Sequence, residues 1–223
     1  MQMATSAHEL TPAVQDYVKA IYGLESAGRK ATTSSLAERM GVSAPSVVAM
    51  TKRLAQLGLL ERPPYRAFAL TGRGRKVALE MLRHHRLIER LLVERLGYSL
   101  DSVHAEAELL EHALSEELEA RIDAQLGFPT HDPHGDPIPD AQLRIAGASG
   151  RSLLDLAPAE RATVARVPDG DPDLLRYLEK LALVPGKEVE LMSIGPFGGP
   201  ATVRSAAGEH ALNRDLAEAI GVA

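Results

Sequence analysis

The 223-residue sequence contains no cysteine, which excludes disulfide bonds, thiolate ligation of a metal and a cysteine nucleophile. No apolar run approaches the about 20 residues that a membrane-spanning helix requires. The first segment, MQMATSAHELTPAVQD, lacks the apolar stretch of a secretory signal peptide. These absences predict a cytoplasmic protein without a membrane partner.

Familiar catalytic motifs are also missing. The sequence has no GxSxG, no Walker phosphate loop and no HExxH metalloprotease motif. The glycine-rich segment GPFGG at 195–199 lacks the lysine and the following helix of a phosphate loop, so we expect a β-turn there. We therefore expect that the protein is not an enzyme.

Charge is distributed unevenly along the chain. The net charge of −5 argues against nucleic-acid binding, but residues 51–90 carry ten lysines and arginines against three glutamates. Residues 91–125 carry two arginines against nine acidic residues. The basic block can face phosphate and the acidic block can hold cations.

The N-terminal third is patterned as three helices followed by two short strands. Apolar spacing and capping residues predict helices over 11–27, 32–40 and 43–58, with a glycine turn between the second and the third. The segment LLERPPYRAFALT then predicts two strands around a turn. This order is typical of a winged helix-turn-helix, which we assign to residues 1–72.

The third helix should be the recognition helix. Val47, Met50 and Leu54 should face the core. None of the small and polar residues that open the helix can make the bidentate contact of arginine with guanine. We expect readout by methyl and hydroxyl contacts and by DNA shape. The residues expected to contact DNA, including the basic pair and the wing tip, are Ser43, Pro45, Ser46, Ala49, Lys52, Arg53, Tyr65 and Arg66.

A first group of candidate metal ligands consists of His104, Glu108, Glu111 and His112. Offsets of three and four place side chains on one face of a helix. Two imidazoles and two carboxylates suit a first-row transition metal, and the carboxylates favour manganese or ferrous iron. A solvated, salt-bridged helix face is the alternative interpretation of any one of these residues.

The long helix expected over 72–96 repeats the pattern with His85 and Glu89. Two facing helices with such pairs can build a metal site. Neighbours on a helix point about 100° apart, so only one of His84 and His85 can be a ligand, and Glu89 favours His85. Asp16 on the first helix is a further candidate donor. We attribute His131 and His134, in a Pro- and Gly-rich segment, to chance.

The remaining pattern predicts a mainly α protein with small β parts. A second helix is expected over 102–127, and the unpatterned stretch FPTHDPHGDPIPDAQLRIAGASGR after it indicates a linker. Short β-type runs with one helical insert then predict a small β-barrel. We assign a helical domain to 73–145, a linker to 146–160 and the barrel to 161–223.

The order of these motifs resembles the diphtheria toxin repressor family of metal-dependent bacterial repressors, especially its manganese-responsive branch. The resemblance is strong over about residues 8–140 and weaker over about 160–223, which is similar to that family's SH3-like domain. The segments that carry it are AIYGLE (20–25), GVSAPSVVAMTKRLAQLGLL (41–60), PYRAFALTGRGR (64–75), HHRLIERLLVERLG (84–97), VHAEAELLEHALSEELEARI (103–122) and HGDPIP (134–139).

The resemblance implies a homodimer whose binding to a palindromic DNA operator is activated by metal, with the helical domain serving dimerisation and metal binding. The recognition-helix glutamine of iron-type members falls on Ala49, so the operator should differ. The implied primary site is Asp16, Glu108, Glu111 and His112, and the implied ancillary site is His85, Glu89 and His104.

The resemblance also bears on the choice of metal. The iron-responsive branch places Met and Cys where this chain has Asp16 and Glu108, and oxygen in place of sulfur favours Mn(II), with Fe(II) or Co(II) as alternatives. Lys19 stands where short manganese regulators place a further Glu ligand, which favours two separated sites. Asp169 or Asp171 could replace ligands that the third domain of iron-type members supplies.

We therefore expect a Mn(II)-dependent transcriptional repressor that controls metal homeostasis genes. An iron-sensing repressor of the same family and a winged-helix regulator of an organic ligand are the alternatives. A metal-handling or hydrolytic enzyme that uses the carboxylate–histidine groups is a further one, but it leaves the basic block without a role.

Overall fold

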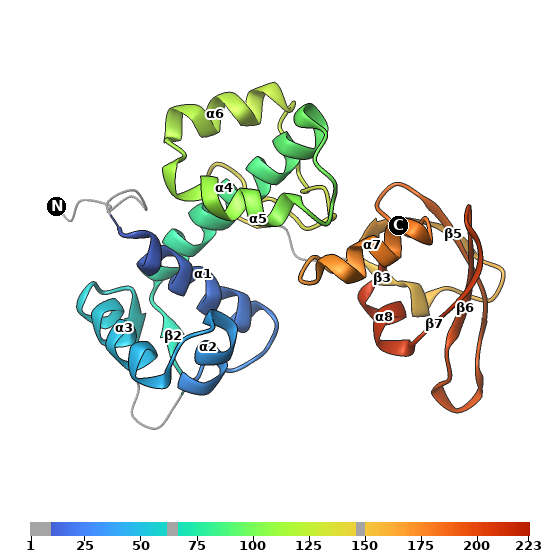
Figure 1. Cartoon of the computed structure of the whole chain (residues 1–223), viewed down its shortest axis with the longest axis horizontal. Helices are drawn as coiled ribbons and strands as arrows, with labels where there is room; N and C mark the ends of the chain where they lie inside the picture. The colour runs from blue at the N-terminus through green and yellow to red at the C-terminus, as the bar shows by residue number, and fades with distance from the viewer. Residues whose placement is uncertain (1–9, 62–66, 146–149) are drawn as a thin grey trace. The chain divides into compact units, whose positions relative to one another are not determined.

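The computed structural model describes residues 10–61, 67–145 and 150–223, and Figure 1 shows the course of the chain. The chain divides into two compact units. Unit 1 comprises residues 1–85, 110–120 and 139–144, and unit 2 comprises residues 86–109, 121–138 and 145–223. Among the described residues, no helix is both long and apolar enough to cross a membrane.

Three short helices begin unit 1, as the sequence predicts: α1 (Pro12–Ser26), α2 (Thr33–Met40) and α3 (Ala44–Gln56). Thr32 caps α2 by accepting a bond from the Ser35 amide, and Ser43 caps α3 in the same way. Gly41 ends α2 in the left-handed region at φ 63°, which a residue with a Cβ rarely adopts. Local caps therefore fix the helix-turn-helix.

The base of the wing is a two-stranded antiparallel ladder of β1 (Leu60–Glu61) and β2 (Ala69–Leu70). Its tip, with the predicted DNA contacts Tyr65 and Arg66, lies outside the described residues. On the inner face of α3, Val47 and Leu54 are fully buried, as predicted. Met50 is only partly buried, and Thr51 takes the third buried position on that face.

The predicted long helix is confirmed as α4 (Gly72–Leu96), but the single helix expected over 102–127 is wrong. The structure has α5 (Val103–Leu110), a 3-10 turn η2 (Glu111–Ala113) and α6 (Glu116–Gln125). Leu114 is extended, and the Ser115 hydroxyl accepts a bond from the Leu118 amide, so a new helix starts there. Glu111 and His112 consequently lie on a tight turn and not on the face of α5.

The segment after α6 is also not the loose linker that its composition indicates. Asp132, His134 and Asp136 are buried. The Arg86 guanidinium donates to the Pro137 carbonyl at 2.5 Å, and Arg83 donates to the carbonyl of Pro139 at 2.8 Å. Long-range bonds from arginines on α4 fix this segment, and a sequence pattern does not reveal such bonds.

Residues 151–223 form a six-stranded antiparallel sheet in the order β3-β8-β4-β5-β6-β7, with two helices. The elements are β3 (Arg151–Ser152), η3 (Leu153–Asp155), β4 (Arg161–Arg166), α7 (Pro172–Lys180), β5 (Glu188–Ile194), η4 (Pro196–Gly198), β6 (Ala201–Ser205), β7 (Gly208–Leu212), α8 (Arg214–Ala219) and β8 (Gly221–Val222).

The predicted β-type runs and the one helical insert correspond to β4, β5, β6 and α7, whereas the second helix, α8, was not predicted. The turn expected at 195–199 contains η4. The chain joins this sheet earlier than the predicted linker over 146–160 implies, since Arg151 pairs with Val222. Leu153 is fully buried in the same core as Val164. The two-residue strands β3 and β8 carry no period that the sequence could reveal.

Gly74 provides a test of the packing between α4 and the wing. A Cβ on Gly74 would lie 2.0 Å from the carbonyl oxygen of Leu59, whereas a Cβ on Gly72 would meet nothing within 4 Å. We expect Gly74→Ala to lower the free energy of unfolding by about 1–3 kcal/mol. Gly72→Ala, the matched control, should stay within about 0.5 kcal/mol of the wild type. Equal stability of the two variants in urea denaturation would contradict this close approach.

Candidate metal centre

Asp16 from α1 and Glu111 and His112 from η2 form a group in unit 1. Each offers one ligand atom, and the three atoms lie within 4.8 Å of one another. His112 Nε2 lies 3.1 Å from Asp16 Oδ1 and 3.9 Å from Glu111 Oε1. Two carboxylates and one imidazole are a donor set that suits Mn(II) or Fe(II).

Gln15 orients the His112 ring. Its side-chain oxygen lies 2.5 Å from His112 Nδ1, and its side-chain nitrogen donates to the Leu10 carbonyl at 3.4 Å. Because an amide oxygen only accepts, His112 Nδ1 must be the donor. His112 Nε2 is then the nitrogen that faces both carboxylates, as a metal ligand must.

Glu111 is the most enclosed member of the group, since its side chain is 0% exposed. The Lys19 ammonium on α1 donates to Glu111 Oε1 at 2.5 Å, and His85 Nδ1 on α4 lies 2.5 Å from Oε2. The carboxylate therefore connects α1, α4 and η2. The choice of His85 over His84 as a ligand stays a prediction.

His84 has a different role from its neighbour. Its Nδ1 lies 3.3 Å from the Glu111 carbonyl oxygen and its Nε2 2.9 Å from Glu119 on α6. Arg83 also donates to Glu119, at 2.5 Å. Burial would raise the pKa of Glu119, but the bonds from His84 and Arg83 lower it below its usual value. These contacts fix α6 against α4.

A second group, in unit 2, consists of the buried residues Glu89, Asp132 and His134, with ligand atoms within 4.8 Å of one another. His134 Nδ1 lies 3.7 Å from Glu89 Oε2, and His134 Nε2 lies 3.2 Å from the Leu100 carbonyl, to which it must donate. Asp132 accepts bonds from the amides of His134 and Asp136, each at 2.9 Å.

Protonation of this second group is strongly perturbed. Burial, together with the charges of Glu89 and Asp136, raises the pKa of Asp132 to about 7. Burial alone would lower the pKa of His134, but its bond to Glu89 and the charges of Glu89 and Asp132 raise it to about 9. Protons therefore offset negative charge at a place where a divalent cation would do the same.

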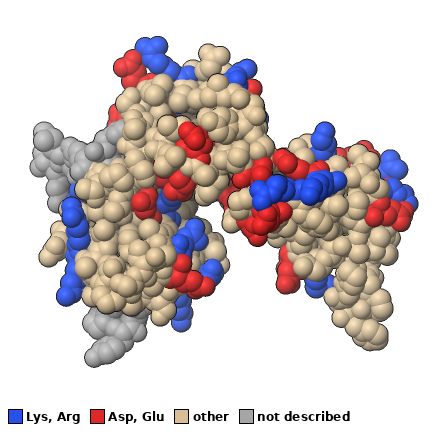
Figure 2. Space-filling model, viewed as in Figure 1, with Lys and Arg blue, Asp and Glu red and all other residues tan. Residues whose placement is uncertain are grey.

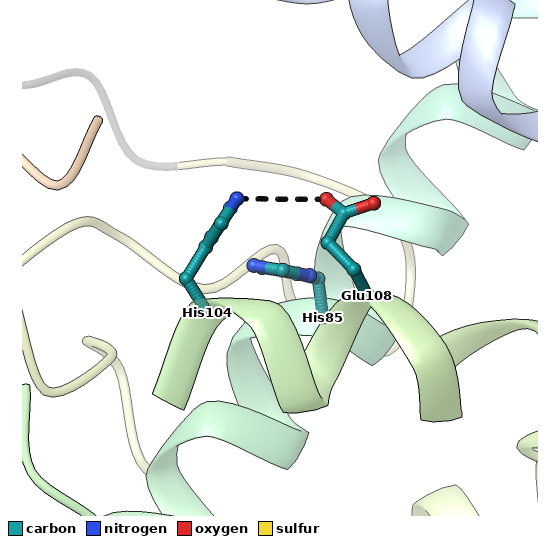
Figure 3. Close-up of side chains that lie close together, drawn as sticks. All are labelled: His85, His104 and Glu108. Carbon is teal, nitrogen blue, oxygen red and sulfur yellow. Dashed lines mark ion pairs between the residues drawn. The ribbon is translucent and has the colours of Figure 1, made fainter. Parts of the chain in front are cut away.

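The other predicted ligands are grouped differently from the prediction. His104 and Glu108 both lie on α5, and Figure 3 shows their side chains beside each other. His104 Nε2 lies 3.7 Å from Glu108 Oε1, and His104 Nδ1 lies 3.3 Å from Glu89 Oε1. Glu108 is thus absent from the group of Asp16, and its assignment to the primary site stays a prediction.

Sequence reasoning missed four residues of these groups: Gln15, Lys19, Asp132 and His134. The available signal for the last two was the alternation of acidic and imidazole side chains in DPHGD at 132–136. Neither Asp169 nor Asp171 belongs to a group of possible ligands within the described residues. The Asp171 side chain instead caps α7.

The expected DNA-contacting residues of α3 are exposed: Ser43, Pro45, Ser46, Ala49, Lys52 and Arg53. Figure 2 shows lysines and arginines along the outer edge of the region that α3 occupies in that view. The hydroxyls of Ser43 and Ser46 lie 2.9 Å apart at the N-terminus of the helix, and the Ser43 hydroxyl also accepts the capping bond. The hydrogen-bonding capacity of these two hydroxyls is therefore partly used within the helix cap.

Comparison with protein families gives three matches that follow one another along the chain. Residues 9–68 match the iron dependent repressor, N-terminal DNA binding domain. Residues 71–140 match the iron dependent repressor, metal binding and dimerisation domain, and residues 151–223 match the FeoA domain.

Curated relatives agree with these matches. The iron-dependent repressor IdeR of Mycobacterium tuberculosis is 34% identical over 227 residues, which cover 96% of this chain and 98% of the relative. The diphtheria toxin repressor of Corynebacterium diphtheriae is 35% identical over 155 residues, covering 70% of this chain and 69% of that protein.

Among solved structures, a manganese-dependent transcriptional repressor in complex with manganese is 41% identical, with a TM-score of 0.81, and the match covers 94% of this chain and 98% of that one. The manganese regulator SloR is 32% identical with a TM-score of 0.77, covering 96% and 99% of the two chains. ScaR with bound Zn²⁺ is 33% identical with a TM-score of 0.78, covering 94% and 98%.

The raised pKa of His134 predicts how stability depends on pH. The folded state holds this proton more tightly than the unfolded chain, so the stabilisation is complete below the usual value of 6.5 and is lost as pH rises through about 9. We expect the metal-free protein to lose about 3 kcal/mol of unfolding free energy over this range through His134. His134→Gln should reduce the loss, and the exposed His131→Gln should not. Identical pH profiles of both variants in denaturant titrations would contradict the buried ion pair.

Proposed function

The chain belongs to the iron-dependent repressor family of metal-dependent, DNA-binding transcriptional repressors, and we propose that it is a cytoplasmic, Mn(II)-sensing member that controls metal homeostasis genes. The observation that carries the choice of metal is the oxygen-rich group of Asp16, Glu111 and His112. Hard carboxylates in a chain without cysteine favour Mn(II) over softer competitors. Similarity to manganese-dependent repressors supports the same choice.

The primary site would use Asp16, Glu111 and His112, with Glu108 as a further expected ligand. Asp16 and His112 are 31% and 18% exposed, so an ion can reach them from solvent. A bound cation would supply positive charge that links carboxylates from separate segments. Gln15 would hold His112 Nε2 toward the ion.

A second ion would bind at Glu89, Asp132 and His134, where the three donors are already assembled. His104 lies 3.3 Å from Glu89, and we propose that it joins these donors together with His85, the other member that the resemblance implies for the ancillary site. A divalent cation would replace the proton of His134, so binding there should strengthen with rising pH.

We further propose a mechanism based on linkage. α1 packs against both α2 and α3 and also carries Asp16, so a metal between Asp16 and η2 would fix the DNA-binding helices relative to the Glu111 segment. In a homodimer, this would hold two recognition helices at a separation matching successive major grooves, about 34 Å or a multiple. Metal and palindromic operator would then each strengthen binding of the other.

The DNA contacts and domain limits extend this proposal. Ser43, Pro45, Ser46 and Ala49 would approach base edges, and Lys52 and Arg53 would contact phosphates, together with Tyr65 and Arg66 at the wing tip.

We propose domains over 1–72, 73–145 and 161–223, with the third domain extended back to Arg151, where β3 begins. No enzymatic activity is part of the proposed function.

An iron-sensing repressor is the second candidate, favoured by the similarity to IdeR and the diphtheria toxin repressor. The deciding experiment selects an operator from random DNA and measures its binding in anaerobic titrations with Mn(II), Fe(II), Co(II) and Zn(II). We expect Mn(II) to activate operator binding at concentrations near the Kd of the protein for Mn(II). Activation by Fe(II) alone would establish the iron alternative, and binding that ignores every metal would overturn both.

Asp16→Ala tests the metal link between α1 and η2. We expect operator binding in saturating Mn(II) to weaken about 10–100-fold, since a ligand is removed, while the circular dichroism spectrum stays unchanged. Glu38→Ala, at an exposed acidic position of α2, is the matched control. Unaltered Mn(II) activation of Asp16→Ala in a gel-shift titration would mean that the link does not pass through this carboxylate.

Replacing both Lys52 and Arg53 by alanine tests the phosphate contacts. We expect weaker binding to all DNA sequences and a plot of log K against log salt that flattens by about 0.9 for each phosphate that the protein no longer neutralises. Lys180→Ala on α7 removes an exposed charge far along the sequence and should leave the slope unchanged. A slope that the double variant leaves intact would show that these side chains do not touch the backbone.

A further inference from the structure

Lys19 is the one cationic side chain of α1 placed against the Asp16 group. It follows Asp16 by three positions, so both side chains lie on the same face of the helix. The Lys19 ammonium lies 2.5 Å from Glu111 Oε1. The Lys19 side chain is 17% exposed, whereas that of Glu111 is fully buried. The lysine therefore reaches from the protein surface to a buried carboxylate.

The Glu111 oxygen that Lys19 contacts is the one that faces the other members of the Asp16 group. Glu111 Oε1 lies 3.9 Å from His112 Nε2, and the other oxygen of Glu111 is bonded to His85. A cation that binds Asp16, Glu111 and His112 together therefore needs the position on Oε1 that the ammonium now holds. Lysine and metal cannot both neutralise this oxygen at hydrogen-bonding distance without strong charge repulsion.

We propose that Lys19 is a resident cation that competes with the sensed metal for Glu111 and thereby sets the metal concentration at which the protein responds. This inference rests on the proposed metal-sensing function and adds a residue that determines its threshold. A buried carboxylate without a cation is strongly destabilised, so the ammonium stabilises the metal-free state. Only the fraction of molecules with Lys19 withdrawn binds metal, which raises the apparent Kd.

The side-chain chemistry of lysine suits this exchange. Its ammonium is a strongly hydrated point charge on a flexible stem, so it can withdraw to solvent when a dication arrives. An arginine would hold the carboxylate with a planar fork and release it less readily. Without metal, one contact of a flexible lysine joins α1 to η2, and a bound metal would replace it by a tighter link through Asp16.

The test compares Mn(II) affinity and metal-free stability of the full-length wild type, Lys19→Met and Lys19→Arg at one pH. We expect Lys19→Met to lower the Kd for Mn(II) about tenfold and to lower the melting temperature of the metal-free protein. Lys19→Arg should bind Mn(II) equally or more weakly than the wild type. Lys30→Met, at an exposed lysine before α2, should change neither quantity.

A Kd for Mn(II) that is unchanged or higher in Lys19→Met would overturn the inference. If Lys19→Met binds Mn(II) with unchanged or weaker affinity, Lys19 only positions Glu111 as a ligand. If that variant does not fold, Lys19→Gln removes the same charge, and Lys19→Arg must still not bind more tightly than the wild type. Failure of the wild type to bind Mn(II) in isothermal titration would contradict the proposed function as well, whereas wild-type binding with unshifted variants would contradict the role of Lys19 alone.

Discussion

The buried carboxylate of Glu111 is the constraint on which the arrangement of unit 1 depends. A fully buried carboxylate must be neutralised or hydrogen-bonded on both oxygens, and its partners come from two different helices, Lys19 of α1 and His85 of α4. The 3-10 turn that carries Glu111 also carries His112, which Gln15 and Asp16 meet from α1. One charge thus fixes the first helix of the DNA-binding region against the segment between α5 and α6.

This arrangement explains how a small ion could control a distant surface. α1 packs on α3, whose exposed residues form the proposed DNA-contacting face, so any change in the contacts of α1 is transmitted through a packed core. The second group of donors repeats the same physical principle in unit 2. There Glu89 and Asp132 are buried together, and a protonated His134 offsets their charge. In the proposed function, a dication would replace an internal positive charge at each of the two groups.

Local sequence signals predicted much of the fold. Caps at Thr32 and Ser43, the left-handed Gly41 and the period of α4 are each encoded within a few residues, and the structure has all of them. The break after α5 was not predicted, because the apolar and charged pattern continues across Leu114 while a serine cap restarts the helix. The buried roles of Asp132 and His134 were missed for a different reason, since they depend on arginines and on Glu89 from α4, far away in sequence.

Hydrogen–deuterium exchange of the full-length protein with and without Mn(II) tests the central claim most directly, because it reports on the link itself and not on its effect on DNA. Metal bound between Asp16 and the Glu111 turn predicts added protection of the amides of α1, Pro12–Ser26, and of Leu114 and the residues around it. Protection confined to residues 86–109 and 121–138 of unit 2, or no change with Mn(II) shown to be bound, would contradict the account.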